Sequence, residues 1–476
     1  MICPGSPGFR ISTEVINMPA AYAKPAFFSK SKSFYRRLFT ILLTVSLQNV
    51  IAYSVNMADN LMLGSYSQVT LSGAATVNQI FFMVQQLSVG ICDSLVIIGS
   101  QYWGKKNVPA LRKVGGCGLK LAVAGGVLIF AICMLFPSQL MAIFTTDADI
   151  AAEGMAYMAI LKYTFILFLV TQALLATLRC ADTVRIAFIV SCISLVVNVG
   201  INYCLIFGKF GMPEMGIRGA AIGTLIARCV ELIVVVVYIL KVDQKVRLFS
   251  ENPLKKDPGI SHDFSVLATQ ILVQELFWAV SIPMQSAIIG HLSSDAIAAN
   301  SIATTFYQYL KIVVRAMASA SAVMIGSAIG RGNIEEVKAE GRTLSVIDLI
   351  LSSILGLILF LLHKPLLSMY SLSDTAYVMA DQLLVLMVFL MVTMGYMMPV
   401  MNGILRGGGD AKFTLYVNMI STWAVVVPLS FMSAFWWKLP VVWVVFFSQS
   451  DQVFKAVIAF LRFRTYKWIN KLTRDE

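Results

Sequence analysis

Polar side chains recur at helical spacing inside the apolar segments of this chain, and some of them can bind protons or cations. One segment carries such residues at intervals of four, three and four: Asn49, Tyr53, Asn56 and Asn60. This spacing puts them on one face of a helix, and Asp59 stands beside that face. A carboxyl group in surroundings of low dielectric favours its neutral form, so such a residue could load and release a proton.

Two more apolar segments carry polar stripes of this kind. One has polar residues seven apart: Gln79, Gln86 and Asp93. The other has them at intervals of three, four and four: Ser191, Ser194, Asn198 and Asn202. Lipid cannot satisfy such groups, so these faces turn toward the bundle interior or a wet cavity. Hydrogen bonding between helices accounts for any single residue, but three stripes in one half of the chain, two of them with a carboxylate, indicate a hydrated cavity.

Other ionisable residues within the segments have simpler interpretations. Arg228 and Glu231 are three residues apart. Asp451 and Lys455 are four apart, and both spacings are typical of ion pairs within one helix. Three more residues lie near predicted segment ends, where their charges can reach the membrane surface: Lys120, Lys162 and Asp348.

The second half of the chain holds an acid that could meet two cations within the bundle. Glu275 lies about midway along its segment, and Lys311 and Arg315 share one face of the next segment. Two roles stay open for these three residues: an ion-pair network that stabilises the bundle, or contacts with a ligand. The candidate cavity residues from both halves are Asn56, Gln86, Asp93, Glu275, Trp278, Lys311 and Arg315.

The composition places these residues in a membrane protein. Of the 476 residues, 58% are apolar and 13% are charged, which excludes a soluble globular chain. Apolar runs of about 20 residues can cross a bilayer as helices and are too long for barrel strands. There are about twelve: 37–63, 70–98, 116–136, 151–176, 184–207, 217–240, 264–289, 297–325, 342–362, 377–403, 412–434 and 439–461. The predicted fold class is an all-α polytopic membrane protein.

The two halves of the chain are copies of one unit. A shift of 226 positions, with one extra residue for the last pair, aligns Gln48 with Gln274, Trp103-Gly104 with Ile329-Gly330, and Leu178-Arg179 with Leu405-Arg406. Each copy holds six segments, an even number, so the copies are parallel repeats about an axis along the membrane normal. Such chains commonly bind a ligand between the copies, which makes transport the first hypothesis.

The repeat divides the chain into two pseudo-symmetric six-helix lobes. Between them, Asn252-Pro253 and Asp257-Pro258-Gly259 break the helical pattern among alternating charges. The predicted divisions are an N-terminal segment at 1–36, an N-lobe at 37–240, a linker at 241–262, a C-lobe at 263–462 and a tail at 463–476.

The net charge of +12 comes from Lys and Arg residues whose positions indicate a membrane topology. Most of the 37 Lys and Arg residues precede the first segment, lie in every second loop or follow the last segment. This asymmetry obeys the positive-inside rule, so both termini and the linker are expected in the cytoplasm. The basic residues could also attract anionic lipid, whereas nucleic-acid binding is not expected. The first 35 residues lack the pattern of a cleavable signal peptide.

The sequence lacks several motifs that are typical of enzymes. It has no GxxxxGK[ST] loop, no HExxH and no GxSxG, and only three histidines. The eight cysteines all lie in the first half without metal-ligand spacing, so packing roles are expected for them. We therefore predict no catalytic residue, no cofactor, no certain metal site and no ATPase subunit.

Four motifs, taken together, resemble one family. They are Gln101-Tyr102-Trp103-Gly104-Lys105-Lys106-Asn107, Asn198 and Asn202 before Phe207-Gly208, Pro213-Glu214-Met215-Gly216-Ile217-Arg218-Gly219-Ala220-Ala221, and Leu405-Arg406-Gly407-Gly408-Gly409-Asp410. In this order, in a two-copy chain of about twelve spans, they resemble the multidrug and toxic compound extrusion (MATE) transporters. The bacterial branch that includes the DinF-like proteins is most similar. The resemblance covers about 35–465.

The resemblance implies a V-shaped pair of lobes in the bacterial cytoplasmic (inner) membrane. It implies a monomeric antiporter that exports small organic, often cationic, compounds by alternating access in exchange for protons or sodium. The cation-coupling pocket of similar members falls here on Asp59, Asn198, Asn202 and Thr224. Related proteins often have aspartate in place of Asn202, so Asp59 becomes the main titrating group and suits a proton better than sodium. Glu275 resembles a second-lobe acid of some branches.

Two other functions compete with export of organic cations. A lipid-linked oligosaccharide flippase shares the two-lobed architecture, and Lys311 and Arg315 would suit a phosphate head group there. The twelve-span count and the Tyr102-Trp103-Gly104 element favour the exporter. A membrane-embedded enzyme or receptor would need a catalytic or metal cluster or a large soluble domain, and the sequence contains neither.

Overall fold

The structure is a computed structural model that describes residues 27–474, apart from 30, 251, 253–256, 291, 293, 369 and 371. The described residues form helices and no strand. Twelve helical stretches among them are long and apolar enough to cross a membrane. The predicted fold class is confirmed. Parts of the predicted N-terminal segment, linker and tail lie outside the described residues.

The first half of the chain supplies six spans and one short helix. They are α1 (Lys32–Tyr66), α2 (Gln68–Gly104), α3 (Val108–Leu135), the short α4 (Pro137–Phe144), α5 (Ala148–Cys180), α6 (Arg185–Phe207) and α7 (Ile217–Lys241). Side-chain caps begin two of these helices. The Asn107 side chain accepts a hydrogen bond from the Ala110 N–H at the start of α3, and Asp147 accepts two at the start of α5.

The second half supplies the other six spans, and its last three are less regular. They comprise α8 (Pro258–Gly290), α9 (Ser294–Arg331), α10 (Ile334–Leu367), α11 (Asp374–Met398) with η1 (Pro399–Leu405), α12 (Ala411–Met419) with η2 (Ile420–Val426), α13 (Val427–Phe431) and η3 (Met432–Trp436), and α14 (Val441–Ser448) with α15 (Asp451–Arg464). The η segments are π-helical turns, which often mark functional positions inside α-helices.

Each predicted apolar segment coincides with one of these spans, and most helices are longer than predicted. The first segment was expected from 37, for example, whereas α1 begins at Lys32. An apolar run reports only the part of a helix that lies in hydrocarbon. The backbone continues its hydrogen-bond ladder into the polar surface layer, so helix ends cannot be read from hydropathy.

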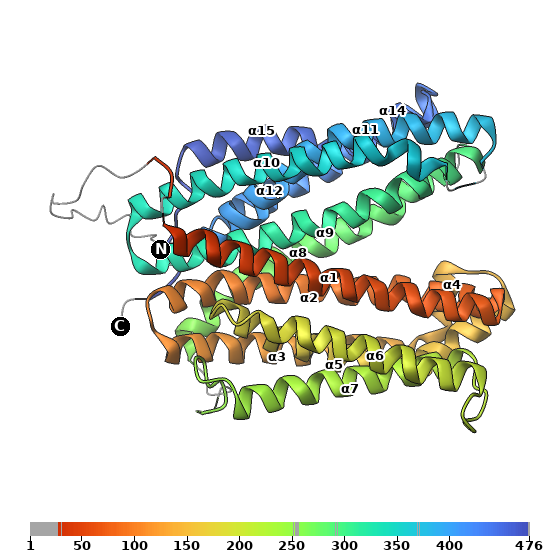
Figure 1. Cartoon of the computed structure of the whole chain (residues 1–476), viewed down its shortest axis with the longest axis horizontal. Coiled ribbons are helices and arrows are strands. Elements are labelled where there is room, and N and C mark those ends of the chain that lie inside the picture. Colours follow the sequence, from red (N-terminus) through yellow and green to blue (C-terminus); the bar gives the residue numbers. More distant parts are fainter. Residues whose placement is uncertain are drawn as a thin grey trace, which may run out of the picture.

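The helices form two groups that touch through a few members. Within the first group α2 packs on α5 and α6 packs on α7, and within the second α10 and α9 pack on α11. The groups meet where α9 contacts α1 and α2, and where α8 contacts α2. In Figure 1 the two groups approach one another at the end where both chain termini lie and diverge toward the opposite end. This is the V shape expected for the fold.

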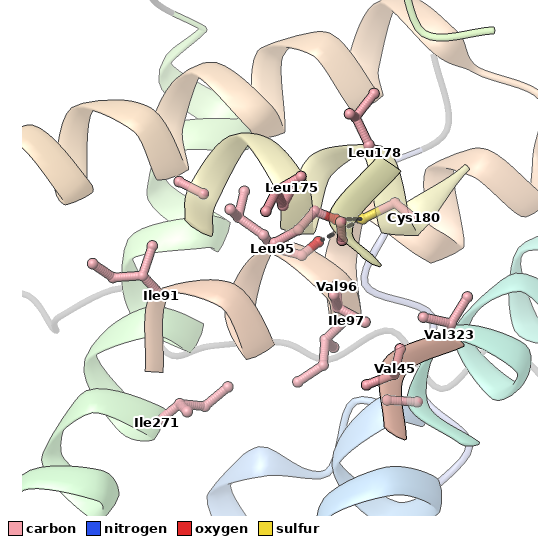
Figure 2. Packing of buried hydrophobic residues seen from close by; sticks show 14 of the residues in the cluster. Val45, Ile91, Leu95, Val96, Ile97, Leu175, Leu178, Cys180, Ile271 and Val323 are labelled. Carbon is pink, nitrogen blue, oxygen red and sulfur yellow. Dashed lines mark hydrogen bonds between the residues drawn. The ribbon is translucent and has the colours of Figure 1, made fainter. Parts of the chain in front are cut away.

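One hydrophobic core continues across the contact between the groups. Figure 2 shows Val45 of α1 and Leu95 of α2 packed in one cluster with Ile271 of α8 and Val323 of α9. All four side chains are almost fully buried. Between helices in a bilayer, close van der Waals packing of such side chains stabilises the contact. The two lobes are therefore held together at this end by the same force that packs each lobe.

Two glycines allow the helices to cross closely at this contact. Gly104 of α2 and Gly330 of α9 are equivalent in the 226-residue repeat. A Cβ at Gly104 would collide with the Ser327 carbonyl oxygen, and one at Gly330 would collide with the Gln101 carbonyl oxygen. Because the obstacles are backbone atoms, no side-chain rotation can relieve the collision. The repeat therefore places a pseudo-symmetric glycine pair at the helix crossing.

Two polar contacts anchor the chain around the crossing. Asp257 caps α8, since its Oδ1 accepts hydrogen bonds from the Gly259 and Ile260 N–H groups. The Lys113 ammonium group lies 2.9 Å from Asp257 Oδ2. The hydrogen bond from Lys113, together with that from the Ile260 N–H, holds the pKa of the Asp257 carboxyl below its usual value. The linker side of α8 is thus tied to α3 in the first lobe.

The segment after α15 crosses back to the first lobe at the same end. Gln101 of α2 donates a hydrogen bond to the Asn470 carbonyl (3.2 Å) and accepts one from the Leu472 N–H (2.8 Å). Trp468 is fully buried against Gly341 and Gly408 of the second lobe. This segment therefore connects α15 to the end of α2 and adds to the contact between the lobes.

We predict that Gly330→Ala destabilises the closed contact between α2 and α9. The added methyl group meets backbone, and overpacking of this kind costs about 1–3 kcal/mol. The matched control is Gly200→Ala, because Gly200 lies within α6 and a Cβ there meets nothing within 4 Å. Thermal unfolding of the purified protein in detergent should show a lower Tm for Gly330→Ala only. Equal Tm values for both variants would contradict a tight crossing.

Candidate functional site

A polar chain links three helices inside the first lobe. Asn202 Nδ2 of α6 donates a hydrogen bond to Asp59 Oδ1 of α1 at 2.6 Å. The same nitrogen lies 3.3 Å from Asn198 Oδ1, and Asn198 Nδ2 donates to Thr224 Oγ1 of α7 at 3.3 Å. The four residues assigned to cation coupling from the sequence therefore form one connected chain. Their roles stay a prediction.

A small cavity lies beside this polar chain. Its volume is about 30 Å³, which is room for a water molecule or a small ion. Its polar lining is Asn56, Asp59, Asn60, Asn78, Tyr157, Thr164, Ser194, Asn198, Thr224 and Arg228. Asn56 and Asn60 of the first polar stripe and Ser194 and Asn198 of the third thus line a common space, whereas no residue of the second stripe is in its lining.

Four polar residues that the sequence did not single out for a cavity also line this space: Asn78, Tyr157, Thr164 and Arg228. Tyr157 is buried and lines the cavity together with Thr224. Arg228 forms the predicted local ion pair with Glu231 at 2.7 Å and also lines the cavity. Its positive charge lies within Coulombic range of Asp59. A single Tyr in an apolar run, or an Arg already explained by a local pair, gives no sequence signal for a cavity position.

A second charged cluster lies where the two lobes meet. Arg406 follows η1, and its side chain is 1% exposed. Its guanidinium group is 2.8 Å from Asp93 Oδ2 on α2 and 3.2 Å from Glu275 Oε1 on α8. One buried cation is therefore held by a carboxylate from each lobe. A buried guanidinium with two carboxylate partners is well compensated, whereas loss of either partner leaves charge exposed to low dielectric.

The internal repeat gives Arg406 a counterpart in the other lobe. Arg179 at the end of α5 aligns with Arg406, and its Nη1 donates to Ser319 Oγ on α9 at 3.1 Å. Ser319 aligns with Asp93 under the 226-residue shift. Each lobe therefore sends an arginine to the equivalent position of the other lobe, but only one of these contacts is an ion pair. The repeat thus relates the positions of the two arginine contacts, but among the described residues a carboxylate partner is present only at Arg406, which meets Asp93, and not at Arg179, which meets Ser319.

Comparison with known proteins agrees with this geometry. The MatE family pattern matches residues 45–204 and 270–432. The chain belongs to the MatE family. Members are transporters, so the chain is a multi-pass membrane transporter and not an enzyme, and the family needs no cofactor.

The relatives of this MatE chain span almost its full length. A probable multidrug resistance protein NorM of Thermotoga maritima is 25% identical over 444 residues, covering 92% of this chain and 95% of the relative. An uncharacterized transporter of Bacillus subtilis, YisQ, is 23% identical over 466 residues, covering 95% and 97%. A solved outward-facing conformation of a multidrug resistance MATE family transporter matches the fold with a TM-score of 0.82 at 15% identity, covering 92% and 98%.

The second-lobe cations lie differently in this MatE protein from the sequence expectation. Lys311 and Arg315 were expected to meet Glu275, but the hydrogen-bonded partner of Glu275 is Arg406. Lys311 lies 5.6 Å from the centre of the Tyr307 ring, and no ion pair within the described residues joins it to Glu275. Arg315 is exposed and reaches Glu275 only at Coulombic range. Helical spacing aligns residues on one helix and cannot choose partners between helices.

The remaining predicted residues have mixed surroundings. Gln86 is buried, and its Oε1 has no partner among the described residues. The Trp278 ring of α8 lies 6.4 Å from the Phe82 ring of α2, so an aromatic pair also joins the lobes. The predicted pair of Asp451 and Lys455 is confirmed at 2.7 Å. The sequence gives no indication that Arg406 is the partner of Glu275, although Leu405-Arg406 aligns with Leu178-Arg179 in the repeat.

We predict that Arg406→Met lowers the stability of the protein by about 3–5 kcal/mol, because two carboxylates lose their buried counterion. Glu275→Gln should cost less, since Arg406 keeps Asp93. The control is Arg474→Met, whose side chain is 54% exposed in its pair with Asp263; such surface pairs contribute about 1 kcal/mol or less. Thermal unfolding in detergent should rank the three variants in this order. An Arg406→Met protein as stable as the control would contradict the proposed pairing.

Proposed function

We propose that this chain is a secondary active antiporter that exports organic, mainly cationic, compounds in exchange for protons by alternating access. The observation that carries the proposal is Asp59, which contacts Asn202 beside a cavity large enough for a water or a small ion. Relatives named multidrug resistance proteins support export of small compounds over the flippase considered from the sequence. Bacterial relatives support a place in the cytoplasmic membrane.

Asp59 suits a proton for a geometric reason. Asn202 presents its amide nitrogen to the carboxylate, so it offers a hydrogen bond and no oxygen ligand on that side. Sodium prefers several oxygen ligands, and Arg228 beside the cavity disfavours a second positive charge there. A proton instead binds the carboxylate directly. Sodium stays the alternative ion, with the Asn198 and Thr224 oxygens as its remaining neutral ligands.

Protonation of Asp59 can change how α1, α6 and α7 hold together. A hydrogen bond from an amide to a charged carboxylate is roughly twice as strong as one between neutral groups. Binding a proton therefore weakens the contact between Asp59 and Asn202, which in turn holds Asn198 and Thr224. A change in these hydrogen bonds would couple proton binding at Asp59 to the packing of three helices in the first lobe.

The contact between the lobes supplies the element that must alternate. Arg406, the glycine crossing and the segment after α15 all join the lobes at the end that holds the termini. If the termini are cytoplasmic, this state is closed to the cytoplasm and faces outward. Release of cargo outside and capture inside then require this contact to open. A ligand can shift such an equilibrium only by binding the two states unequally.

Cationic cargo has a carboxylate and aromatic rings available between the lobes. The Asp93 side chain is 37% exposed although it contacts Arg406. The Phe82 and Trp278 rings lie near one another on α2 and α8. Aromatic faces attract organic cations, and a carboxylate adds charge selectivity. The lobes at 37–240 and 263–462, joined by 241–262, are the units that we propose to move.

We predict that Asp59→Asn abolishes gradient-driven efflux and leaves a folded protein, because the amide cannot carry a proton across the cycle. Uptake of ethidium by inverted vesicles, with proton and sodium gradients imposed separately, measures this. Asp149→Asn is the control, since that carboxylate lies exposed in the first turn of α5. Transport by Asp59→Asn at the native rate, with dissipation of an imposed pH gradient, would contradict the proposal.

The cytoplasmic placement of the termini can be tested separately. Single cysteines at Ser138 and Lys255, in a background without the native cysteines, should react with a membrane-impermeant maleimide from opposite faces. Ser138 lies in α4, and Lys255 lies outside the described residues. Labelling of both positions from the same face would overturn the proposed topology.

A further inference from the structure

An aspartate in the second lobe is buried with no counterion in the described part of the chain. Asp348 on α10 was expected near a membrane surface, where its charge could reach water, but its exposure is 1%. Within the described residues, neither of its carboxylate oxygens has a hydrogen-bond partner. Its α10 neighbours one turn before and one turn after are Ser345 and Ser352, which are also buried. The sequence interpretation of Asp348 was therefore wrong.

The surroundings of Asp348 are polar without being charged. Ser345 Oγ donates a hydrogen bond to Tyr396 Oη of α11 at 3.3 Å. Ser352 donates to the Leu349 carbonyl and fits against Gly395, where any side chain would collide. Tyr396 is the titratable group that interacts electrostatically with Asp348 from α11. Among the described residues of α9, α10 and η1, no charged group pairs with it.

This arrangement determines the protonation state in the observed conformation. A charged carboxylate without a counterion or a hydrogen bond costs several kcal/mol when buried, so the neutral form is strongly favoured. The same site can still stabilise the charged form after a small rearrangement. The Ser345 and Ser352 hydroxyls share a helix face with Asp348 and can rotate to donate to it. Tyr396, which accepts the hydrogen bond from Ser345, is half-buried.

We propose that Asp348 is a second proton-binding site, in the second lobe, that loads and releases a proton during the transport cycle. This inference rests on the proposed proton-coupled export. It assigns one buried carboxyl to each lobe, Asp59 in the first and Asp348 in the second. In the observed state the Asp348 site is neutral and closed. Opening of the contact between the lobes changes the packing of α9, on which α10 rests, and can admit the serine and tyrosine donors.

The occupancy of the site can be tested on the full chain without substrate. A hydrophobic carbodiimide reacts with neutral carboxyl groups in apolar surroundings, and mass spectrometry of the digested protein locates the product. Asp348 should be labelled at acidic pH and progressively less as the pH rises. Asp451 is the internal control, because it is paired with Lys455 and should stay unlabelled. Labelling of Asp348 that does not change with pH, or no labelling at all, overturns the proposal.

Coupling is tested in proteoliposomes by the number of protons moved per ethidium transported. In Asp348→Asn this ratio should fall by about one half, while Asp59→Asn should lose coupled transport. If the wild-type protein moves no protons with ethidium, the proposed function fails and the labelling result alone decides the Asp348 site. If the wild type is coupled and Asp348→Asn keeps its full ratio, the second site is overturned and the proposed function stands.

Discussion

Charge inside a membrane must be compensated or removed, and this constraint organises the interior of the molecule. Arg406 is compensated by Asp93 and Glu275 across the contact between the lobes. Asp59 has an amide donor and an arginine at Coulombic range, whereas Asp348 has neither among the residues that the structure describes. Charges that have partners, such as Arg406 with its two carboxylates, stabilise the fold. Where compensation is incomplete, a proton can do the compensating, which is how a carboxyl group becomes a coupling site.

The compensated charges and the small residues concentrate at one end of the lobe contact. Gly104 and Gly330 let two helices cross at backbone distance, and Arg406 and Arg179 each reach into the opposite lobe nearby. Packed interfaces of this kind are bistable: they are either closed or open, and they do not deform continuously from one state to the other. The repeat thus places equivalent glycines and arginines from both halves at the contact that closes this end of the molecule.

Much of the fold followed from the sequence, because hydropathy and helical spacing each report a property of a single segment. The twelve spans and the polar stripe of Asn198 and Asn202 are of this kind. Partners between helices are not: Glu275 was matched to Lys311 and Arg315, yet Arg406 reaches it from a span far along the chain. Asp348 was judged by its distance from a segment end, whereas its burial depends on how α10 packs on α11.

The central claim is that the Asp59 carboxylate exchanges a proton against organic cations. The most direct measurement is proton release from the purified protein in weakly buffered detergent solution on addition of ethidium, with binding followed by fluorescence. The account predicts that binding to the wild-type protein releases protons and that Asp59→Asn binds ethidium with clearly less release. Wild-type binding without any proton release, or undiminished release from Asp59→Asn, would contradict it.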